Sequence, residues 1–324
     1  LGDCIKVNLK NKMKASRASF FAPGLAFDPR DSQGLNVGNN AGDQTVAPGE
    51  SRTYTYYAHP LNKETTSLVW DGGNIVVNPR NGLYGAIVIG PKGSQYRDPV
   101  TGADVSQKNV WRADVIVDTT LTENAGKRNY RDVALFFQDE DNIIGTAFMP
   151  YVQNVAGLTS VNYRAEPYKF REEQGCSLGK IFQPCAVDKP EDPVTPLIEA
   201  HAGDAVRIHV IGANSEQNGM FGVEGHEWPI EPYMPGADMI SVVEYAGSEV
   251  LDVFIRGGAG GPYRQVGDFV WSNARLPYTQ SGQWGYLRVL PTGDSRIQPL
   301  SASGSGARQA EVQPGAQAIP TAMK

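Results

Sequence analysis

The 324-residue sequence lacks the features of a membrane-spanning or nucleic-acid-binding protein. No apolar run approaches the roughly 20 residues that cross a bilayer as a helix, and no signal peptide is recognisable. Lys and Arg number 29 against 35 Asp and Glu, with no basic run and no face of basic and aromatic residues. We therefore expect no membrane span and no nucleic-acid partner. Because a secreted protein loses its leader, the missing signal peptide does not decide the compartment.

Cysteine is scarce and is limited to Cys4, Cys176 and Cys185. Cys176 and Cys185 bracket a short loop, and their spacing permits a local disulfide; two free buried thiols are the alternative. The disulfide would indicate an oxidising compartment. Cys4 would then be left over, either buried or paired with a group outside this chain.

Only four histidines are present, and three of them lie within residues 201–231. Residues 205–210 alternate apolar and polar, residues 212–219 contain turn formers, and residues 220–228 are predicted to form a second strand. A metal site, if there is one, is expected near this hairpin. Its weak candidate ligands are His226, His209 and Glu224, because positions 224 and 226 would share one face of a strand. The alternative for His226 is a histidine packed beside Trp228.

No independent catalytic motif accompanies these histidines. The sequence has no HExxH run, no Ser-His-Asp order and no P-loop lysine after its glycine-rich segment 257–261. We therefore predict no catalytic and no cofactor-binding residue from motifs alone.

The sequence repeats itself at an offset close to 200 residues. Gly2-Asp3 matches Gly203-Asp204, residues 46–58 match 244–256, and residues 82–89 match 283–289. Three matches in one order indicate a duplicated domain. With 36 glycines and 22 prolines punctuating short strands, each copy is predicted to be an all-β sandwich. We place the domains at 1–125 and 126–291, and expect a disordered or extended linker-like tail at 292–324.

The two copies differ at their starts. Strand-like sequence, including DVALFFQDED at 132–141, precedes the Gly-Asp pair of the second copy, whereas one residue precedes that of the first. The first sandwich is therefore predicted to lack its N-terminal strand, which leaves a neighbouring strand unpaired at a sheet edge. A removed N-terminal part or another chain would supply the missing strand, so a homo-oligomer formed by strand donation is one expectation.

Several longer runs resemble a known family. GDQTVAPGESRTYTYYA, NPRNGLYGAIVIGPKGS, FFQDED with NYRAEP, and GDFVWSNARLPYTQSGQWGYLRVLP occur in order across residues 1–291. They resemble the cupredoxin domains of multicopper oxidases, with the greatest likeness to large bacterial oxidases of the manganese-oxidase type. The resemblance implies two tandem cupredoxin-like Greek-key sandwiches and a secreted, extracellular or periplasmic oxidoreductase. It also implies copper as the cofactor, with oxidation of a metal or a phenol coupled to O₂ reduction.

The sequence departs from that family where copper would bind. A type 1 copper site uses two His and one Cys, and no cysteine here has a histidine one or two residues away. His-x-His pairs for a trinuclear cluster need more histidines than the four present, and Phe21 and Pro23 stand where such a pair often occurs. We therefore expect this chain to bind no copper alone, which leaves open whether the protein is an enzyme. It would be a non-catalytic portion of such an oxidase, partnered by other cupredoxin domains or subunits. The alternative is a degenerate cupredoxin pair that serves as a structural, surface or filament subunit.

Overall fold

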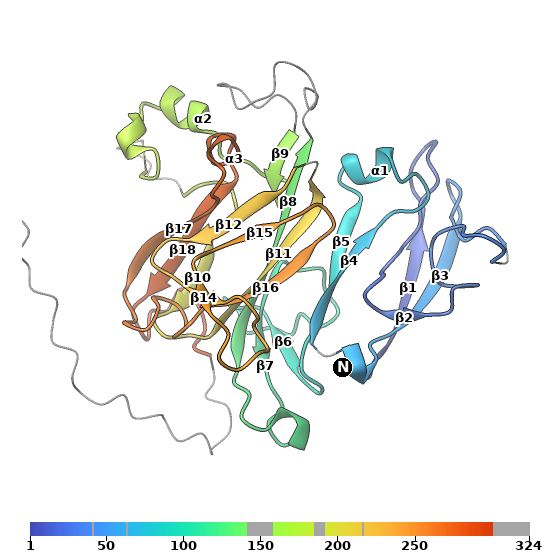
Figure 1. The fold of residues 1–324 in the computed structure, drawn as a ribbon, viewed down its shortest axis with the longest axis horizontal. Helices are drawn as coiled ribbons and strands as arrows, with labels where there is room; N and C mark the ends of the chain where they lie inside the picture. Colours follow the sequence, from blue (N-terminus) through green and yellow to red (C-terminus); the bar gives the residue numbers. More distant parts are fainter. Residues whose placement is uncertain (41, 63, 141–157, 185–191, 216, 301–324) are drawn as a thin grey trace, which may run out of the picture.

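The computed structural model describes residues 1–40, 42–62, 64–140, 158–184, 192–215 and 217–300. The regular secondary structure of the described chain is almost entirely β-strand, which confirms the predicted fold class (Figure 1). None of its helices is long and apolar enough to cross a membrane. The helices are α1 (Val77–Arg80), α2 (Tyr168–Glu173) and α3 (Leu276–Gln280), with single 3₁₀ turns η1 (Pro60–Asn62), η2 (Thr122–Asn124) and η3 (Leu178–Lys180).

The larger unit is a sandwich of two sheets. One sheet has the order β16-β11-β8-β7-β6, with β9 paired to β8, and the other has the order β10-β18-β17-β12-β15. Alternating apolar side chains, such as Val133 and Leu135 of β8 and Ile208 and Val210 of β11, point into one shared core. The first sheet comprises β6 (Gln95–Arg97), β7 (Arg112–Ile116), β8 (Tyr130–Glu140), β9 (Leu158–Val161), β11 (Val206–Ser215) and β16 (Val250–Phe254). The second comprises β10 (Ile198–His201), β12 (Gly219–Val223), β15 (Val242–Tyr245), β17 (Gly267–Asn273) and β18 (Trp284–Leu290). The short strands β13 (Trp228–Pro229) and β14 (Met239–Ile240) form a separate two-stranded sheet.

The smaller unit has a three-stranded sheet, ordered β1-β3-β2, and a two-stranded hairpin, β4-β5. Tyr54 and Tyr56 of β3 anchor its core, where Thr/Tyr alternation puts both rings on the buried face. In Figure 1 the three-stranded sheet lies at the right-hand side of the molecule, and the β4-β5 hairpin lies between it and the larger unit. They are β1 (Cys4–Lys10), β2 (Ala26–Phe27), β3 (Ser51–Tyr57), β4 (Thr65–Trp70) and β5 (Tyr84–Ile89).

The β4-β5 hairpin lies between the two units. Val69 and Ile89 belong to the core of the smaller unit. Leu68, on the opposite face of β4, packs with Ala134 of β8 and Ile211 of β11. The outer face of the larger unit's sheet is therefore covered by the hairpin, and this contact positions the polar groups described below.

Two sequence-based expectations are corrected by the strand pairing. The boundary placed between residues 125 and 126 separates β7 from β8, although these strands are antiparallel neighbours in one sheet. β6 and β7 therefore join the larger unit, because their backbone hydrogen bonds extend its sheet. The predicted hairpin within residues 201–231 is also wrong: β11 and β12 belong to opposite sheets of the sandwich. Residues 301–324 of the expected tail lie outside the described residues.

Candidate functional site

A buried polar site is built on the outer face of β11. Strand alternation turns Arg207 and His209 away from the apolar core, toward Asp132 of β8 and Asp252 of β16. Arg207 donates through Nε and Nη2 to the two carboxylate oxygens of Asp132, both at 2.8 Å. His209 donates through Nε2 to Oδ1 of Asp132 at 2.8 Å and through Nδ1 to Oδ1 of Asp252 at 2.5 Å. A carboxylate only accepts hydrogen bonds, so both ring nitrogens of His209 carry protons.

The charges of this cluster stabilise one another. Burial opposes the charged form of His209, but the Asp132 carboxylate overcomes that effect and raises the pKa of His209 above its usual value. Burial alone would raise the pKa of Asp132, yet the His209 and Arg207 cations lower it below the usual range. The pKa of Asp252 is lowered for the same reason, against burial, through its hydrogen bond from His209. Two cations and two anions thus form a neutral, buried network.

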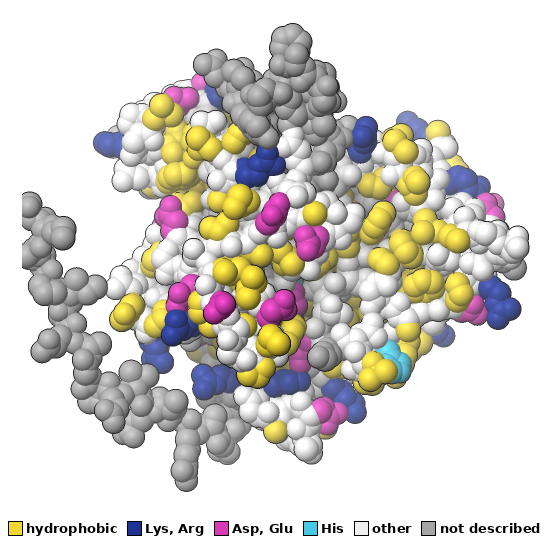
Figure 2. Space-filling view, viewed as in Figure 1, with side chains coloured by type: hydrophobic (Ala, Val, Ile, Leu, Met, Phe, Trp, Pro, Cys, Tyr) yellow, Lys and Arg dark blue, Asp and Glu magenta, His cyan; other side chains and the backbone are white. Residues whose placement is uncertain are grey.

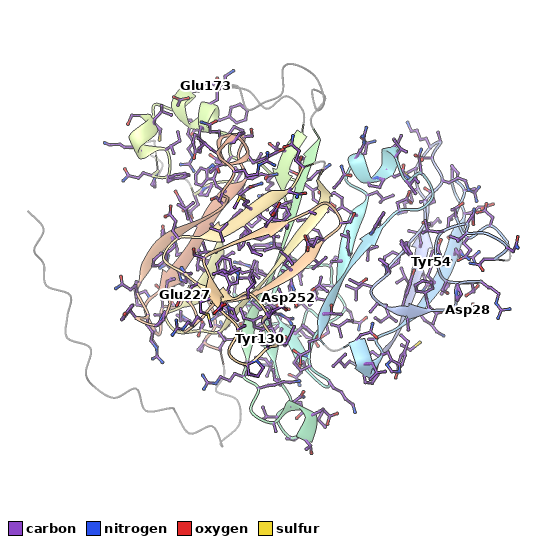
Figure 3. The ribbon with its side chains drawn as sticks, viewed as in Figure 1. Asp28, Tyr54, Tyr130, Glu173, Glu227 and Asp252 are labelled. Carbon is purple, nitrogen blue, oxygen red and sulfur yellow. The ribbon has the colours of Figure 1, made fainter. Side chains whose placement is uncertain are left out.

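The smaller unit closes this network. Thr66 of β4 places Oγ1 2.7 Å from Nδ1 of His209. Leu68 of the same strand packs against Ala134 and Ile211 of the larger unit's sheet. Tyr233 approaches from the loop after β13, and its hydroxyl lies 3.3 Å from Oδ2 of Asp252. Figure 3 labels Asp252 and Tyr130 in this region, and the Tyr130 ring lies 4.7 Å from the Arg207 guanidinium. His209 is only 1% exposed, so no substrate reaches it in this arrangement.

A second buried network surrounds Arg131, the neighbour of Asp132 on β8. Arg131 donates to both oxygens of Asp114 at 2.8 and 3.0 Å and to Asp204 at 2.7 Å. His201 lies beside it: Nδ1 is 3.4 Å from Arg131 Nη2, and Nε2 is 2.9 Å from the carbonyl of Asp294. Burial raises the pKa of Asp114 to about 6 despite its ion pair with Arg131. This network ties β7 and β8 to the segment after β18.

His226 follows a turn and does not belong to a strand. β12 ends at Val223, and the chain turns at 224–225, so positions 224 and 226 do not share a strand face. Nδ1 of His226 donates to the carbonyl of Glu224 at 2.7 Å, and Nε2 accepts the Gly260 N–H at 3.0 Å. Gly260 has a φ of +80° and approaches Gln265 so closely that a side chain has no room there. His226 thereby holds the glycine-rich loop that follows β16.

The structure does not assemble the three candidate metal ligands. His209 belongs to the network on the outer face of β11, His226 to the glycine-rich loop, and Glu224 exposes its side chain to solvent. Within the described ranges, no group of three or more His, Cys, Asp or Glu side chains has the geometry of a metal site. His201, His209 and His226 are all buried, and Figure 2 accordingly shows histidine surface at one place only.

The cysteine predictions are resolved only for Cys4, which is free and exposed. Cys176 is buried. Its expected partner, Cys185, lies outside the described residues, so their disulfide stays a prediction.

Sequence reasoning missed the carboxylates of the His209 network. Asp132 and Asp252 come from strands that are 120 residues apart, and only the sheet brings them to one histidine. A local signal was present: Arg207 and His209 alternate with the apolar residues Val206, Ile208 and Val210 at the start of their strand. Two basic side chains on one face of a buried strand require acidic partners.

Comparison with known proteins defines the class of this fold. No protein-family model and no curated protein matches the chain. Several solved structures do. A blue copper oxidase from Nitrosomonas europaea aligns over 89% of this chain and 74% of its own, at 16% identity and a TM-score of 0.54. The multicopper oxidase mgLAC aligns over 90% and 74%, at 17% identity and a TM-score of 0.55. A copper nitrite reductase from Nitrosomonas europaea aligns over 93% and 83%, at 13% identity and a TM-score of 0.50.

These likenesses show that the chain has the fold of cupredoxin-domain copper proteins, and the expected cupredoxin-like sandwich is confirmed. Identities of 13–17% show the fold alone. The chemistry must be argued from the residues of this chain.

Proposed function

We propose that this chain is a non-catalytic cupredoxin portion of an oxidoreductase of the multicopper-oxidase type. The copper ligands of the working assembly would come from other cupredoxin domains or subunits. The assembly would be secreted or periplasmic, and it would oxidise a metal ion or a phenol at the expense of O₂. The resemblance to manganese-oxidase-type proteins makes Mn(II) the first substrate to try.

The observation that carries this proposal is the state of the buried histidines. His209 uses both ring nitrogens as donors to carboxylates. His226 uses one to donate and one to accept. His201 lies between Arg131 and the carbonyl of Asp294. A copper ligand must offer a free nitrogen lone pair, so a metal could bind at these histidines only by breaking their present hydrogen bonds.

Copper loading tests the proposal directly. The purified chain is incubated with Cu(II), or with Cu(I) without oxygen, passed through a weak chelating column, and analysed for copper and for blue thiolate–copper absorption. We expect no stoichiometric copper and no blue colour. A His59→Gln variant is the matched control for adventitious binding, because His59 is only partly buried and lies outside both networks. Copper retained at one atom per chain in both proteins, with blue absorption, would overturn the non-catalytic assignment.

The role in an assembly is tested on native material by measuring copper content and intact mass together. Copper in particles that also carry other cupredoxin domains, with oxidase activity toward Mn(II) or a phenol, would support the proposal. Copper-free particles built from this chain alone would instead support the second candidate, a structural or filament subunit. The observation that favours this second candidate is the outer edge of β1, with which no strand of the described residues pairs.

A further inference from the structure

The segment 72–83, which joins β4 to β5, exposes three consecutive β-branched residues. Ile75, Val76 and Val77 are 63%, 59% and 47% exposed. A run of three exposed apolar residues favours association, and an apolar patch rimmed by polar groups marks an interaction site. We call Ile75, Val76 and Val77 the apolar tip.

Side-chain hydrogen bonds hold the apolar tip in one conformation. Asn74 accepts the Val77 N–H through Oδ1 at 3.1 Å, and its own N–H donates to Oδ2 of Asp71 at 2.8 Å. Asn78 donates through Nδ2 to the same Asp71 oxygen at 2.7 Å, and both of these side chains are buried. The tip is therefore ordered before it binds anything, which lowers the entropic cost of a contact.

The surroundings of the apolar tip are basic. The loop 12–17 lies against the segment that carries the tip, because the Asn78 side chain donates to the Arg17 carbonyl at 2.8 Å. This loop also carries the exposed side chains of Lys12 and Lys14. Neither the loop nor the segment 72–83 contains an aspartate or a glutamate. A partner that covers the tip should therefore present carboxylates around an apolar centre.

A second apolar surface of the same chain has that character. It comprises the exposed face of the β12-β15 pair and the loop between β13 and β14. Its exposed apolar residues are Met220, Ile230, Met234, Met239 and Val242. Its exposed acidic residues are Glu231, Asp238 and Glu244. Residues 217–249 contain no lysine and no arginine. We call this set the acidic surface.

Strand pairing makes the acidic surface continuous. Met220 of β12 lies opposite Glu244 of β15, so their side chains are neighbours on one face. β14 directly precedes β15 in the chain, and the Ile230 N–H donates to the Asp238 carbonyl at 2.9 Å beside it. In Figure 2, Asp and Glu side chains are interspersed with apolar surface in the middle of the molecule, whereas Lys and Arg lie beside apolar surface near α1.

The two surfaces are complementary, and they do not cover each other within one molecule. The apolar residues of both are exposed in the same copy. One surface is the end of a hairpin with lysines beside it, and the other is a sheet face and loop with carboxylates beside it. An apolar centre with charges at its rim is the usual build of a specific protein interface, and opposite charges at the rim select the partner.

We infer that the apolar tip of one copy of this chain docks on the acidic surface of a second copy. The branched side chains of the tip pack against the methionines of the acidic surface, which adapt to their shape. Lys12 and Lys14 lie near its carboxylates. Because each copy carries both surfaces, the contact forms twice in a closed dimer or repeats along a chain of copies. This inference goes beyond the proposed function, because it holds whether or not the assembly contains copper.

Sedimentation velocity of the 324-residue chain over a range of concentrations tests the contact. We expect reversible association in low salt that weakens as salt is added, because salt screens exposed charges. Val76→Asp places a carboxylate in the tip, against the acidic surface, and should raise the dissociation constant at least about tenfold. Leu178→Asp is the matched control, because Leu178 is 66% exposed and belongs to neither surface. It should leave association unchanged.

Charge exchange identifies the two surfaces that meet. One variant carries Lys12→Glu and Lys14→Glu, and the other carries Glu231→Lys and Glu244→Lys. Each variant alone should associate at least about tenfold more weakly than the wild type, because like charges then face each other. An equimolar mixture of the two should regain association, since every contact between unlike variants joins opposite charges. Recovery in the mixture also shows that both variants are folded.

Zero-length cross-linking of amines to carboxylates locates the contact. A mixture of ¹⁵N-labelled and unlabelled chain is cross-linked in low salt and digested. We expect peptides that join Lys12 or Lys14 to Glu231, Asp238 or Glu244, with one half of each pair labelled and the other unlabelled. Such pairs found only within one isotope would place the contact inside a single copy and overturn the inference.

Three other outcomes would also overturn it. A monomer at every concentration in low salt would show that the two surfaces do not bind each other. Association that persists unchanged in Val76→Asp and in both charge variants would place the contact elsewhere on the molecule. Binding of a monomeric chain to anionic lipid vesicles, lost in Val76→Asp, would assign the apolar tip to a membrane surface instead.

Discussion

Nε2 of His209 lies 2.8 Å from Oδ1 of Asp132, across the parallel pair β8 and β11. The Nδ1 of the same ring is bound to Asp252, so the imidazole is a buried cation held between two carboxylates. Thr66 of the β4-β5 hairpin contacts the same ring. His209 is therefore part of the junction between the two units rather than an idle core residue.

Removing this cation should destabilise the protein strongly. His209→Gln leaves Asp252 without its charged partner and Asp132 with only Arg207. Breaking a buried ion pair by deleting one partner costs about 3–5 kcal/mol. Urea unfolding at neutral pH should show this loss, whereas His59→Gln, which removes a partly buried histidine, should change stability by less than about 0.5 kcal/mol. A small effect of His209→Gln would contradict the charged network.

The His209 contribution should depend on pH with a definite sign. Its pKa is raised in the folded protein, whereas an unfolded histidine titrates near about 6.5. The stabilisation is therefore fully present below the unfolded pKa and is lost as pH rises through the folded pKa. Urea unfolding across this range should show the gap between the wild type and His209→Gln narrowing as pH rises. A gap that widens with pH would show that His209 is neutral when folded.

The stabilisation from the two carboxylates of the same network should be lost as pH falls, not as it rises. The pKa values of Asp132 and Asp252 are lowered by the His209 and Arg207 cations, against burial. Their stabilisation is present above the unfolded aspartate pKa and is lost as pH falls through the folded values. Asp252→Asn should therefore reduce the steepness of acid unfolding, measured by near-ultraviolet circular dichroism. An unchanged acid transition would argue against the ion pair.

His226 should stabilise the glycine-rich loop as a neutral ring. His226→Leu leaves the Gly260 N–H and the Glu224 carbonyl without their partner, at a cost of about 1–3 kcal/mol. Amide exchange should accelerate in residues 256–261. Glu224→Gln is the matched control, because Glu224 contributes only its backbone carbonyl to this contact and should leave exchange unchanged. Equal acceleration in both variants would reassign the role to the Glu224 side chain.

Burial lowers the pKa of His226, so its pH dependence has the opposite sign to that of His209. Protonating Nε2 removes the acceptor for Gly260, and the unfolded chain binds that proton more readily. Loop protection should therefore fall as pH drops below about 6.5. Exchange measured at pH values on either side of this point tests the prediction, and protection that increases on acidification would contradict it.

The predicted disulfide between Cys176 and Cys185 is open to a simple chemical test. Alkylation of the denatured, unreduced protein should modify Cys4 alone, and all three cysteines should react after reduction. The Cys4→Ser variant should then take up no label before reduction. Three labels without reduction would show free thiols and remove the argument for an oxidising compartment.

The predictable part of this fold follows from local sequence patterns. The alternation of Thr and Tyr from Thr53 to Tyr56 is a strand pattern that puts Tyr54 and Tyr56 of β3 on the buried face, because strand side chains point alternately to the two faces. The repeat at an offset near 200 residues marked β1 and β11 as equivalents, and both pair with the same kind of neighbour. The boundary at residue 125 was misplaced because the repeat matches end at residue 89. They therefore do not show to which sheet β6 and β7 belong.

The candidate site was harder to predict, because it depends on which strands become neighbours. The sequence by itself determined the β class, the scarcity of histidine and the alternation that puts Arg207 and His209 on one face. Only the tertiary structure decided that Asp132 and Asp252 flank that face, that Thr66 covers it, and that His226 bonds to Gly260. The physical reason is that alternation along a strand is local, whereas charge pairing and hydrogen bonding across sheets depend on the register of strands that are distant in sequence.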